Sequence, residues 1–246
     1  MSILSDIAGS VGKRRLHMTL IDPASQSPEK SGIIAREADE AGSDYIMIGG
    51  STSVSPEMVD ETVASIKAHC SLRTILFPGS ADMISRKADA IFFMTLMNSR
   101  NPKFLMGYQV RAARYLKSLG IEILPMGYII FQPGMTVGRV GEADLVGRDD
   151  KETAASYAVA AEMLGLKLVY FESGSGSPTT IPAETIKFAR KQINIPLIVG
   201  GGIRSEKSAR EISIAGADII VTGTVAEKAS AVLEVLKPII NAVRSG

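Results

Sequence analysis

The apolar positions along the chain form eight short runs, and each run is continuous rather than alternating with polar residues. Runs of this kind predict the strands of a parallel sheet that other elements cover on both faces. The expected strands span residues 16–21, 45–48, 74–77, 90–94, 123–130, 166–171, 195–199 and 218–221.

Amphipathic stretches separate most of these runs and predict helices. Two of them open with serine, proline and glutamate, at Ser27 and Ser55, and this combination caps a first helical turn. The expected helices span residues 28–41, 56–69, 103–119, 151–164, 182–191, 205–215 and 227–243. Eight strand units in 246 residues predict a single domain, residues 1–246, folded as a closed (β/α)8 barrel of the TIM-barrel class.

The third unit of this barrel is shorter than the others. Too few residues separate Phe77 from Ala90 to hold a full helix and two loops. We therefore expect one helical turn or an irregular segment there, so that the barrel is modified at its third helix.

Composition excludes several classes of protein. The 27 basic and 26 acidic residues nearly cancel, whereas nucleic-acid binding calls for a basic face. The single cysteine, Cys70, has no partner for a disulfide within the chain, which favours a reducing compartment. No apolar run approaches the roughly 18 residues of a membrane span. We expect a cytoplasmic protein.

The mean hydropathy is nevertheless slightly positive. A fully buried parallel sheet, an apolar interface between copies of the chain and an apolar substrate groove would each explain it. We expect a homo-oligomer, and we leave open whether a product is released at a membrane surface.

Three glycine-rich loops follow the last three expected strands, at residues 172–177, 200–205 and 222–225; we call them the glycine cradle. A phosphate group needs convergent N–H donors and a close approach of the backbone, which glycine permits. A tight turn explains one such loop. Three loops at the end of a barrel where phosphate sites typically lie predict a phosphate site.

A second cluster follows the first two strands. Asp22 ends the first apolar run ahead of Pro23, and Ser51 follows Gly49 and Gly50 after the second. An aspartate before proline is often only a turn residue, but catalytic groups of barrels stand at these strand ends. Mg²⁺ takes one or two carboxylates and completes its shell with phosphate oxygens and water. The pattern favours a Mg²⁺ site at Asp22.

Three further side chains have alternative interpretations. Glu172 lies beside the cradle, where it either orients or deprotonates a substrate hydroxyl or serves as a capping or salt-bridging acid. Tyr170 either faces the same ligand or fills the barrel interior. His17 lies inside the first strand, and we interpret it as structural.

Taken together, the motifs resemble the geranylgeranylglyceryl phosphate synthase family, which includes bacterial heptaprenylglyceryl phosphate synthases. The resemblance covers about residues 16–235, and the order of the motifs makes it specific. The motifs are HMTLIDP at 17–23, IGGS at 48–51, YIIFQPG at 128–134, YFESGSG at 170–176, VGGGI at 199–203 and TGT at 222–224.

The resemblance implies a Mg²⁺-dependent prenyltransferase that joins the 3-hydroxyl of sn-glycerol 1-phosphate to geranylgeranyl diphosphate, forming the first ether bond of archaeal-type membrane lipids. It implies metal ligands at Asp22 and Ser51, and catalytic roles for Glu172 and Asp22. The implied substrate contacts are Tyr170, Phe171, Glu172, Ser173, Gly174, Ser175, Gly176, Gly201, Gly202, Gly223 and Thr224.

One position departs from the family. Many relatives carry an acid or a lysine soon after the Asp-Pro pair, where this chain has Ala24 and Ser25. The contacts to the diphosphate are expected to differ there, while Asp22 is retained. The apolar residues 91–97 and 123–130 are expected either to line a prenyl groove or to pack the barrel.

Two other functions fit parts of the pattern. A phosphosugar isomerase or lyase barrel of amino-acid biosynthesis would need paired acids or a lysine at the mouth. No lysine closes an expected strand, so Asp22 and Glu172 would have to act together. A non-catalytic module that binds glycerol phosphate or a prenyl lipid would tolerate the loss of Asp22.

Overall fold

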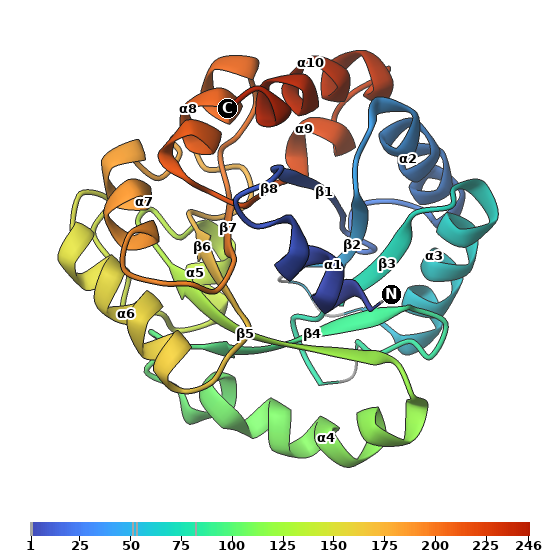
Figure 1. The fold of residues 1–246 in the computed structure, drawn as a ribbon. Helices are drawn as coiled ribbons and strands as arrows, with labels where there is room; N and C mark the ends of the chain where they lie inside the picture. Colours follow the sequence, from blue (N-terminus) through green and yellow to red (C-terminus); the bar gives the residue numbers. More distant parts are fainter. Residues whose placement is uncertain (1, 51, 53, 82) are drawn as a thin grey trace.

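The structure is a computed structural model that describes residues 2–50, 52, 54–81 and 83–246. In this part of the chain, eight parallel strands close into a barrel in sequence order, and β8 pairs with β1 (Figure 1). The expected (β/α)8 barrel is confirmed. The strands are β1 (Leu16–Ile21), β2 (Tyr45–Gly49), β3 (Arg73–Phe77), β4 (Ala90–Leu96), β5 (Glu122–Ile130), β6 (Leu168–Glu172), β7 (Leu197–Gly200) and β8 (Ile219–Thr222).

Helices alternate with the strands and surround the barrel (Figure 1). They are α1 (Ile3–Ser10), α2 (Pro28–Ala41), α3 (Pro56–His69), a short π-helical segment η1 (Lys103–Gly107) that continues into α4 (Tyr108–Leu119), α5 (Met135–Val140), α6 (Lys151–Met163), α7 (Ala183–Arg190), α8 (Glu206–Ala215), α9 (Thr224–Glu227) and α10 (Val232–Arg244).

The helices α2 and α3 have the bounds that their sequence signals predict. The Ser27 hydroxyl accepts a hydrogen bond from the Lys30 N–H at 3.3 Å, and the Ser55 hydroxyl accepts one from the Met58 N–H at 3.2 Å. α2 ends at Gly42, which adopts the left-handed conformation with φ 101°. Local capping chemistry therefore places these helices.

The third unit has an irregular connection, as expected. The described residues between Phe77 and Ala90 form bends and turns rather than a helix. The wall of the barrel beside β3 and β4 is covered from one side by α4, which follows β4.

Other helices differ from the expectation. The sequence did not predict α1 and α5, which are only eight and six residues long. The expected helix 227–243 is wrong at its start, because Glu227 ends α9 and α10 begins at Val232. Between them Ala231 is extended, with φ −132° and ψ 90°, and this backbone interrupts the helix.

The helix α1 covers the N-terminal end of the barrel, in front of the strands in Figure 1. Its Ile3 and Ile7 side chains are buried in the barrel interior. The Glu122 carboxylate accepts hydrogen bonds from the N–H groups of Ile3 at 2.7 Å and Leu4 at 2.8 Å, which stabilises the start of the helix. This end of the barrel is closed.

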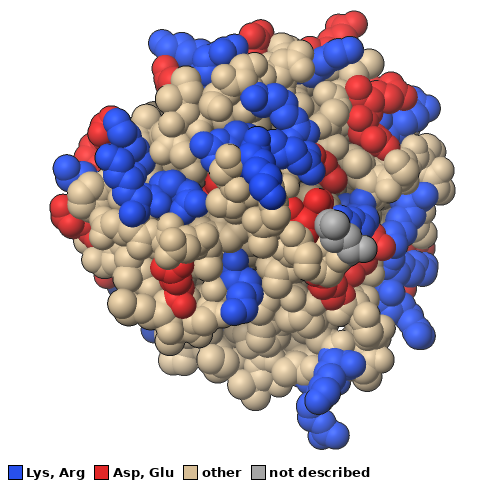
Figure 2. All heavy atoms as spheres, viewed as in Figure 1, with Lys and Arg blue, Asp and Glu red and all other residues tan. Residues whose placement is uncertain are grey.

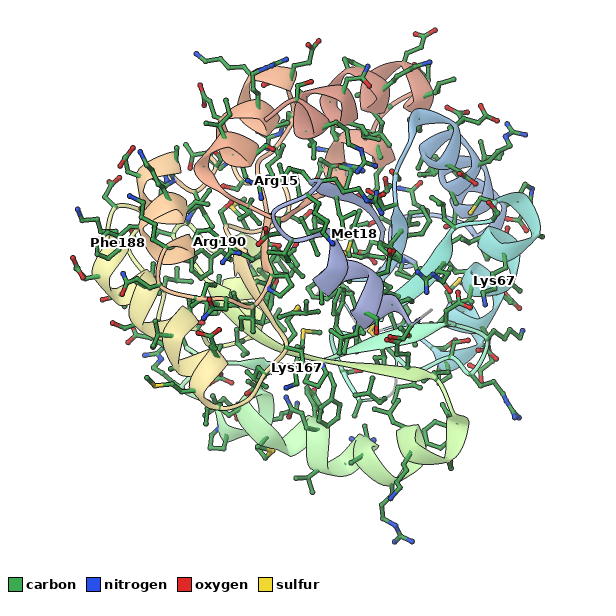
Figure 3. The ribbon with its side chains drawn as sticks, in the orientation of Figure 1. Arg15, Met18, Lys67, Lys167, Phe188 and Arg190 are labelled. Carbon is green, nitrogen blue, oxygen red and sulfur yellow. The ribbon has the colours of Figure 1, made fainter. Side chains whose placement is uncertain are left out.

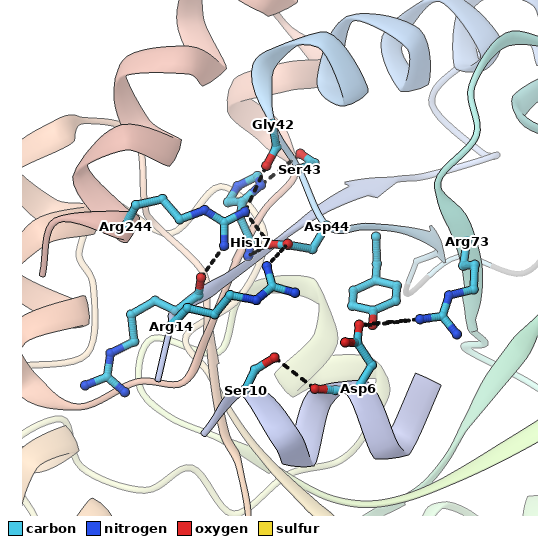
Figure 4. A network of polar contacts seen from close by, with 11 residues as sticks. Asp6, Ser10, Arg14, His17, Gly42, Ser43, Asp44, Arg73 and Arg244 are labelled. Atoms are coloured by element: carbon cyan, nitrogen blue, oxygen red, sulfur yellow. Dashed lines mark hydrogen bonds and ion pairs between the residues drawn. The ribbon is translucent and has the colours of Figure 1, made fainter. Parts of the chain in front are cut away.

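A polar network surrounds Asp44 at the same end (Figure 4). Its carboxylate lies 2.6 Å from the Arg14 guanidinium and 2.8 Å from that of Arg244, and it accepts a hydrogen bond from the His17 N–H at 2.8 Å. These contacts join the start of β1 and the end of α10 to the start of β2.

A second network forms around Asp218, just before β8, and includes Arg15 and Arg190, which are labelled in Figure 3. Its carboxylate lies 3.1 Å from Arg15 and 3.1 Å from Arg190, and it accepts a hydrogen bond from the Leu197 N–H at 2.9 Å. Polar groups at this end of a barrel typically stabilise the fold, which leaves the opposite end for the functional site.

The His17 side chain belongs to this structural layer. Its neighbours Leu16 and Met18 lie in the barrel interior, so His17 points toward the helices. Its two ring nitrogens lie 2.9 Å from the hydroxyls of Ser43 and Thr222. The structural interpretation of His17 agrees with this placement.

The surface carries charges of both signs. On the face with α1, basic groups lie beside acidic ones and leave large uncharged areas (Figure 2). Within the described residues, every helix is too short or too polar to cross a bilayer.

Candidate active site

Two cavities meet at the C-terminal end of the barrel. The larger has a volume of about 190 Å³ and reaches from Asp22 and Glu172 at the mouth to Leu116 of α4. The smaller, of about 40 Å³, lies over the ends of β6, β7 and β8. Glu172 and Ser175 line both cavities, so a ligand in one can reach a ligand in the other.

The smaller cavity is formed by the glycine cradle. Most of the expected substrate contacts line it, which brings together residues from three separate loops. They are Tyr170, Glu172, Ser175, Gly176, Gly201, Gly202, Gly223 and Thr224.

Gly201 shows why the cradle needs glycine. Its backbone has φ +87°, a conformation that other residues rarely adopt. A Cβ atom there would lie 2.4 Å from the Ser173 hydroxyl and 2.5 Å from Oε1 of Glu172. A side chain at this position would therefore collide with the end of β6 and the loop that follows it.

Side chains tie the three loops together. The hydroxyls of Ser175 and Thr224 lie 2.9 Å apart, which links the loop after β6 to α9. Nη2 of Arg204, from the loop after β7, donates to the carbonyls of Gly176 at 2.8 Å and Ser177 at 2.6 Å. Arg204 also lines the cradle, where its charge favours an anion. Arg204 was not among the predicted site residues, although it lies two residues after the glycine triplet.

Three expected substrate contacts do not line the cavity. Phe171 packs in the outer core, with its ring centroid 4.8 Å from that of Phe131. The buried Ser173 hydroxyl donates to the Thr179 carbonyl at 3.3 Å, and Gly174 donates its N–H to Glu172. Substrate contact at these positions stays a prediction.

Glu172 is a buried carboxylate at the end of β6. Burial raises its pKa, and the Gly174 N–H, which lies 2.6 Å from Oε1, opposes that shift. A carboxylate with a raised pKa in a cavity is typical of a group that exchanges a proton with a ligand.

Tyr170 lies beside Glu172, and its position fits both alternatives for Tyr170: packing in the barrel interior and facing a ligand. Its ring packs inside the barrel, 5.2 Å from that of Tyr128 and 5.7 Å from that of Phe77. Burial, and then the Glu172 charge, raise the pKa of Tyr170 well above its usual value. The hydroxyl is buried, borders the cradle and interacts with the Glu172 carboxylate, although it forms no hydrogen bond of regular geometry among the described residues. A buried hydroxyl without a well-formed hydrogen bond at a cavity is available to a ligand.

Asp22 follows β1 on the opposite side of the mouth. It is half-buried, and burial raises its pKa, an effect that the Ala24 N–H opposes by donating to Oδ1 at 2.9 Å. Gly50 leaves room for the carboxylate, because a Cβ atom at Gly50 would lie 2.4 Å from Oδ2. The other expected metal ligand, Ser51, lies outside the described residues.

A second carboxylate lies at this side of the mouth. Oε1 of Glu227, at the end of α9, accepts a hydrogen bond from the Asp22 backbone N–H at 3.0 Å. Both residues line the larger cavity. Glu227 was expected at the start of a long helix, and nothing in the sequence predicted this contact.

The rest of the larger cavity is mostly apolar. Of the two apolar segments expected to line a groove, 91–97 contributes most of its residues, and 123–130 contributes Tyr128. Phe104, Tyr108 and Leu116 of η1 and α4 form the far wall. The cavity follows the side of the barrel where bends and turns, rather than a helix, make up the described residues between β3 and β4.

Comparison with known proteins decides the family. The sequence profile described as the PcrB family matches residues 10–242. The chain belongs to the PcrB family. This PcrB family member is 54% identical to the geranylgeranylglyceryl phosphate synthase of Picrophilus torridus over 99% of the chain and 100% of the relative. It is 53% identical to that of Thermoplasma volcanium, over 100% of the chain and 97% of the relative.

Solved structures of a near relative and of a distant protein have the same fold. The (S)-3-O-geranylgeranylglyceryl phosphate synthase from Thermoplasma acidophilum, in complex with its substrate sn-glycerol-1-phosphate, matches with TM-score 0.99 and 48% identity over all of both chains. A thiamine phosphate pyrophosphorylase from Pyrococcus furiosus matches with TM-score 0.61 and 15% identity over 95% of this chain and 96% of the other, which shows the barrel fold alone.

Proposed function

We propose that this chain is a prenyltransferase that joins the 3-hydroxyl of sn-glycerol 1-phosphate to geranylgeranyl diphosphate and releases diphosphate. The observation that carries the proposal is the meeting of a glycine cradle and a long apolar cavity at one barrel mouth. The names of the relatives, and the sn-glycerol-1-phosphate bound to the Thermoplasma acidophilum enzyme, support it. The product would carry the first ether bond of archaeal-type membrane lipids.

The acceptor occupies the cradle in this proposal. Backbone N–H groups of the three loops and the Arg204 guanidinium hold the phosphate. Glu172, which borders both cavities, accepts a hydrogen bond from the 3-hydroxyl and orients its oxygen toward the larger cavity. Because Glu172 is buried, few water molecules compete with the hydroxyl for its carboxylate.

The donor occupies the larger cavity, with its diphosphate near Asp22 and its prenyl chain along the apolar wall toward α4. The hydroxyl oxygen forms a bond to C1 of the prenyl chain while the bond from C1 to the diphosphate oxygen breaks. The electron pair leaves with the diphosphate, and the hydroxyl proton passes to Glu172 or to water. An allylic carbon favours a loose transition state, so orientation and charge stabilisation dominate.

The residues at the donor side fit Mg²⁺. Asp22 offers a carboxylate in the cavity, Gly50 leaves space beside it, and Ser51 is the further proposed ligand. No three His, Cys, Asp or Glu side chains among the described residues cluster as a self-sufficient metal site. A site that relies on one carboxylate and on phosphate oxygens suits Mg²⁺. When bound, the ion would neutralise charge on the departing diphosphate.

Two features of the whole protein are further proposals. Large apolar side chains are exposed, among them Met163 at 83%, Leu164 at 71% and Ile214 at 66% exposure, which supports a homo-oligomer. The single cysteine supports a location in the cytoplasm.

The experiment that tests the function is an incubation with sn-glycerol 1-phosphate, MgCl₂ and prenyl diphosphates of several lengths, with product masses read out. We expect geranylgeranylglyceryl phosphate, and no product when EDTA is added. A protein that binds both substrates and yields no ether product would contradict the proposal.

Substitution of Asp22 tests the donor side. Asp22→Ala removes the carboxylate, and Asp22→Asn removes its charge while keeping an acceptor for the Ala24 N–H. Both variants should lose transfer activity by about 10²-fold or more while the barrel stays folded. Near-normal turnover of either variant with Mg²⁺ would show that the metal assignment is wrong.

A further inference from the structure

The four residues of α9 touch both halves of the barrel mouth. At the first residue, the Thr224 hydroxyl lies 2.9 Å from the Ser175 hydroxyl in the glycine cradle. At the last residue, Glu227 accepts a hydrogen bond from the Asp22 N–H at 3.0 Å. A single helical turn thus connects the acceptor side of the mouth to the donor side.

The contact from Glu227 holds the Asp22 backbone after it has left the sheet. Asp22 is the first residue beyond β1, so its N–H has no strand partner. The Asp22 carboxylate in turn accepts from the Ala24 N–H at 2.9 Å, which folds the chain into a tight turn. The hydrogen bond to Glu227 therefore fixes the position of this turn and of the Asp22 carboxylate.

An acid is an unusual anchor at this position. Glu227 and Asp22 line the same cavity, where two carboxylates repel each other. The charges of Lys228 and Lys30 oppose this repulsion, but among the described residues neither lysine forms an ion pair with Glu227. A neutral acceptor would satisfy the same N–H without repulsion, whereas a carboxylate accepts a stronger hydrogen bond.

We propose that Glu227 is a positioning residue that fixes Asp22 from α9, so that filling the glycine cradle with the acceptor strengthens binding of the diphosphate across the mouth. This inference rests on the proposed function. A phosphate in the cradle restrains Gly223 and Thr224, and the one-turn helix transmits the restraint to Glu227. Coupling of this kind is reciprocal, so each ligand raises the affinity for the other by the same factor.

The test measures binding rather than turnover. Isothermal titration calorimetry of the full chain gives the Kd of inorganic pyrophosphate with MgCl₂, with and without saturating sn-glycerol 1-phosphate. The variants are Glu227→Ala, which removes the acceptor, and Glu227→Gln, which keeps an acceptor oxygen without the charge. Glu234→Ala, on the exposed side of the next helix, is the matched control for loss of a carboxylate.

For the wild type and Glu234→Ala, we expect pyrophosphate to bind more tightly when sn-glycerol 1-phosphate is present. In Glu227→Ala the Kd of pyrophosphate should rise about tenfold, the effect of losing one hydrogen bond to a charged acceptor. The enhancement by sn-glycerol 1-phosphate should vanish, while the affinity for sn-glycerol 1-phosphate alone stays within about twofold. Glu227→Gln should retain the enhancement.

Three results would overturn the inference. They are a wild type without enhancement, a Glu227→Ala variant that keeps it, and a Glu227→Gln variant that loses it as fully as the alanine variant. The last would show that the charge of Glu227 acts rather than its hydrogen bond. Failure of the proposed function looks different, because the wild type would then bind neither ligand. Thermal unfolding of each variant confirms that the barrel is intact.

Discussion

The burial of Glu172 gives this residue its chemistry. The residue is 6% exposed, and the hydrogen bond from the Gly174 N–H holds its carboxylate at the mouth. Sequence position alone placed Glu172 beside the cradle, but it could not separate an orienting acid from a capping acid. The closed barrel encloses the carboxylate with Tyr170, which favours the orienting role that we propose.

Glu172→Gln should lower kcat by about 10²-fold or more, because it removes the proton acceptor and keeps the shape of the side chain. In the wild type, kcat/KM should fall as pH is lowered through a pKa above the ordinary glutamate range, since burial raises that pKa and the acid form cannot accept a proton. A pH–rate profile measures both. A variant with wild-type kcat and the same acid limb would refute the role.

His17 predicts how stability depends on pH. Burial lowers its pKa to about 3, with Asp44 acting against the shift and Arg244 with it. The unfolded chain takes up a proton below its ordinary pKa of about 6.5, while the folded one does not until about pH 3. The free energy of unfolding should therefore fall by about 2 kcal/mol between pH 7 and pH 5, compared with a variant that carries a non-titrating side chain at position 17. Urea unfolding of the wild type and of His17→Gln at several pH values measures this difference. An unfolding free energy that changes equally with pH in both proteins would contradict it.

At the scale of elements, the strands and the longer helices follow from local chemistry. Continuous apolar runs located all eight strands to within about two residues, and serine caps fixed the starts of α2 and α3. The short elements α1 and α5 were missed because they carry few periodic positions. Glu227 was misplaced because its partner, Asp22, is 205 residues away in the sequence. Contacts of that span are invisible to a local pattern.

The cradle loops yield a prediction at this scale. Gly201→Ala should raise the KM for sn-glycerol 1-phosphate at least about tenfold, because its Cβ would press on Ser173 and Glu172. The positive φ should also cost about 1–3 kcal/mol of unfolding free energy. Gly165→Ala is the control, with φ +80° but open space around its Cβ. Gly165→Ala should lose stability while its KM for sn-glycerol 1-phosphate stays unchanged. An equal KM for both variants would contradict the prediction that the Cβ at position 201 disturbs the cradle.

The whole molecule separates stability from chemistry along the barrel axis. Ion pairs around Asp44 and Asp218, and the cover provided by α1, close the N-terminal end. The opposite end holds Glu172, Asp22 and the two cavities. The chemistry was expected at the end where the cavities lie, because loops after parallel strands meet there. Whether the apolar residues beside α4 line a groove or pack the barrel could not be predicted from the sequence. Side-chain volumes decide this only once the barrel has folded.

The central claim is that the acceptor hydroxyl attacks C1 of the prenyl diphosphate across this mouth. The direct measurement uses sn-glycerol 1-phosphate carrying ¹⁸O in its 3-hydroxyl, geranylgeranyl diphosphate and MgCl₂, with mass spectrometry of both products. We expect all of the label in the ether of geranylgeranylglyceryl phosphate. Label in the released diphosphate, or no ether product from protein that binds both substrates, would contradict it.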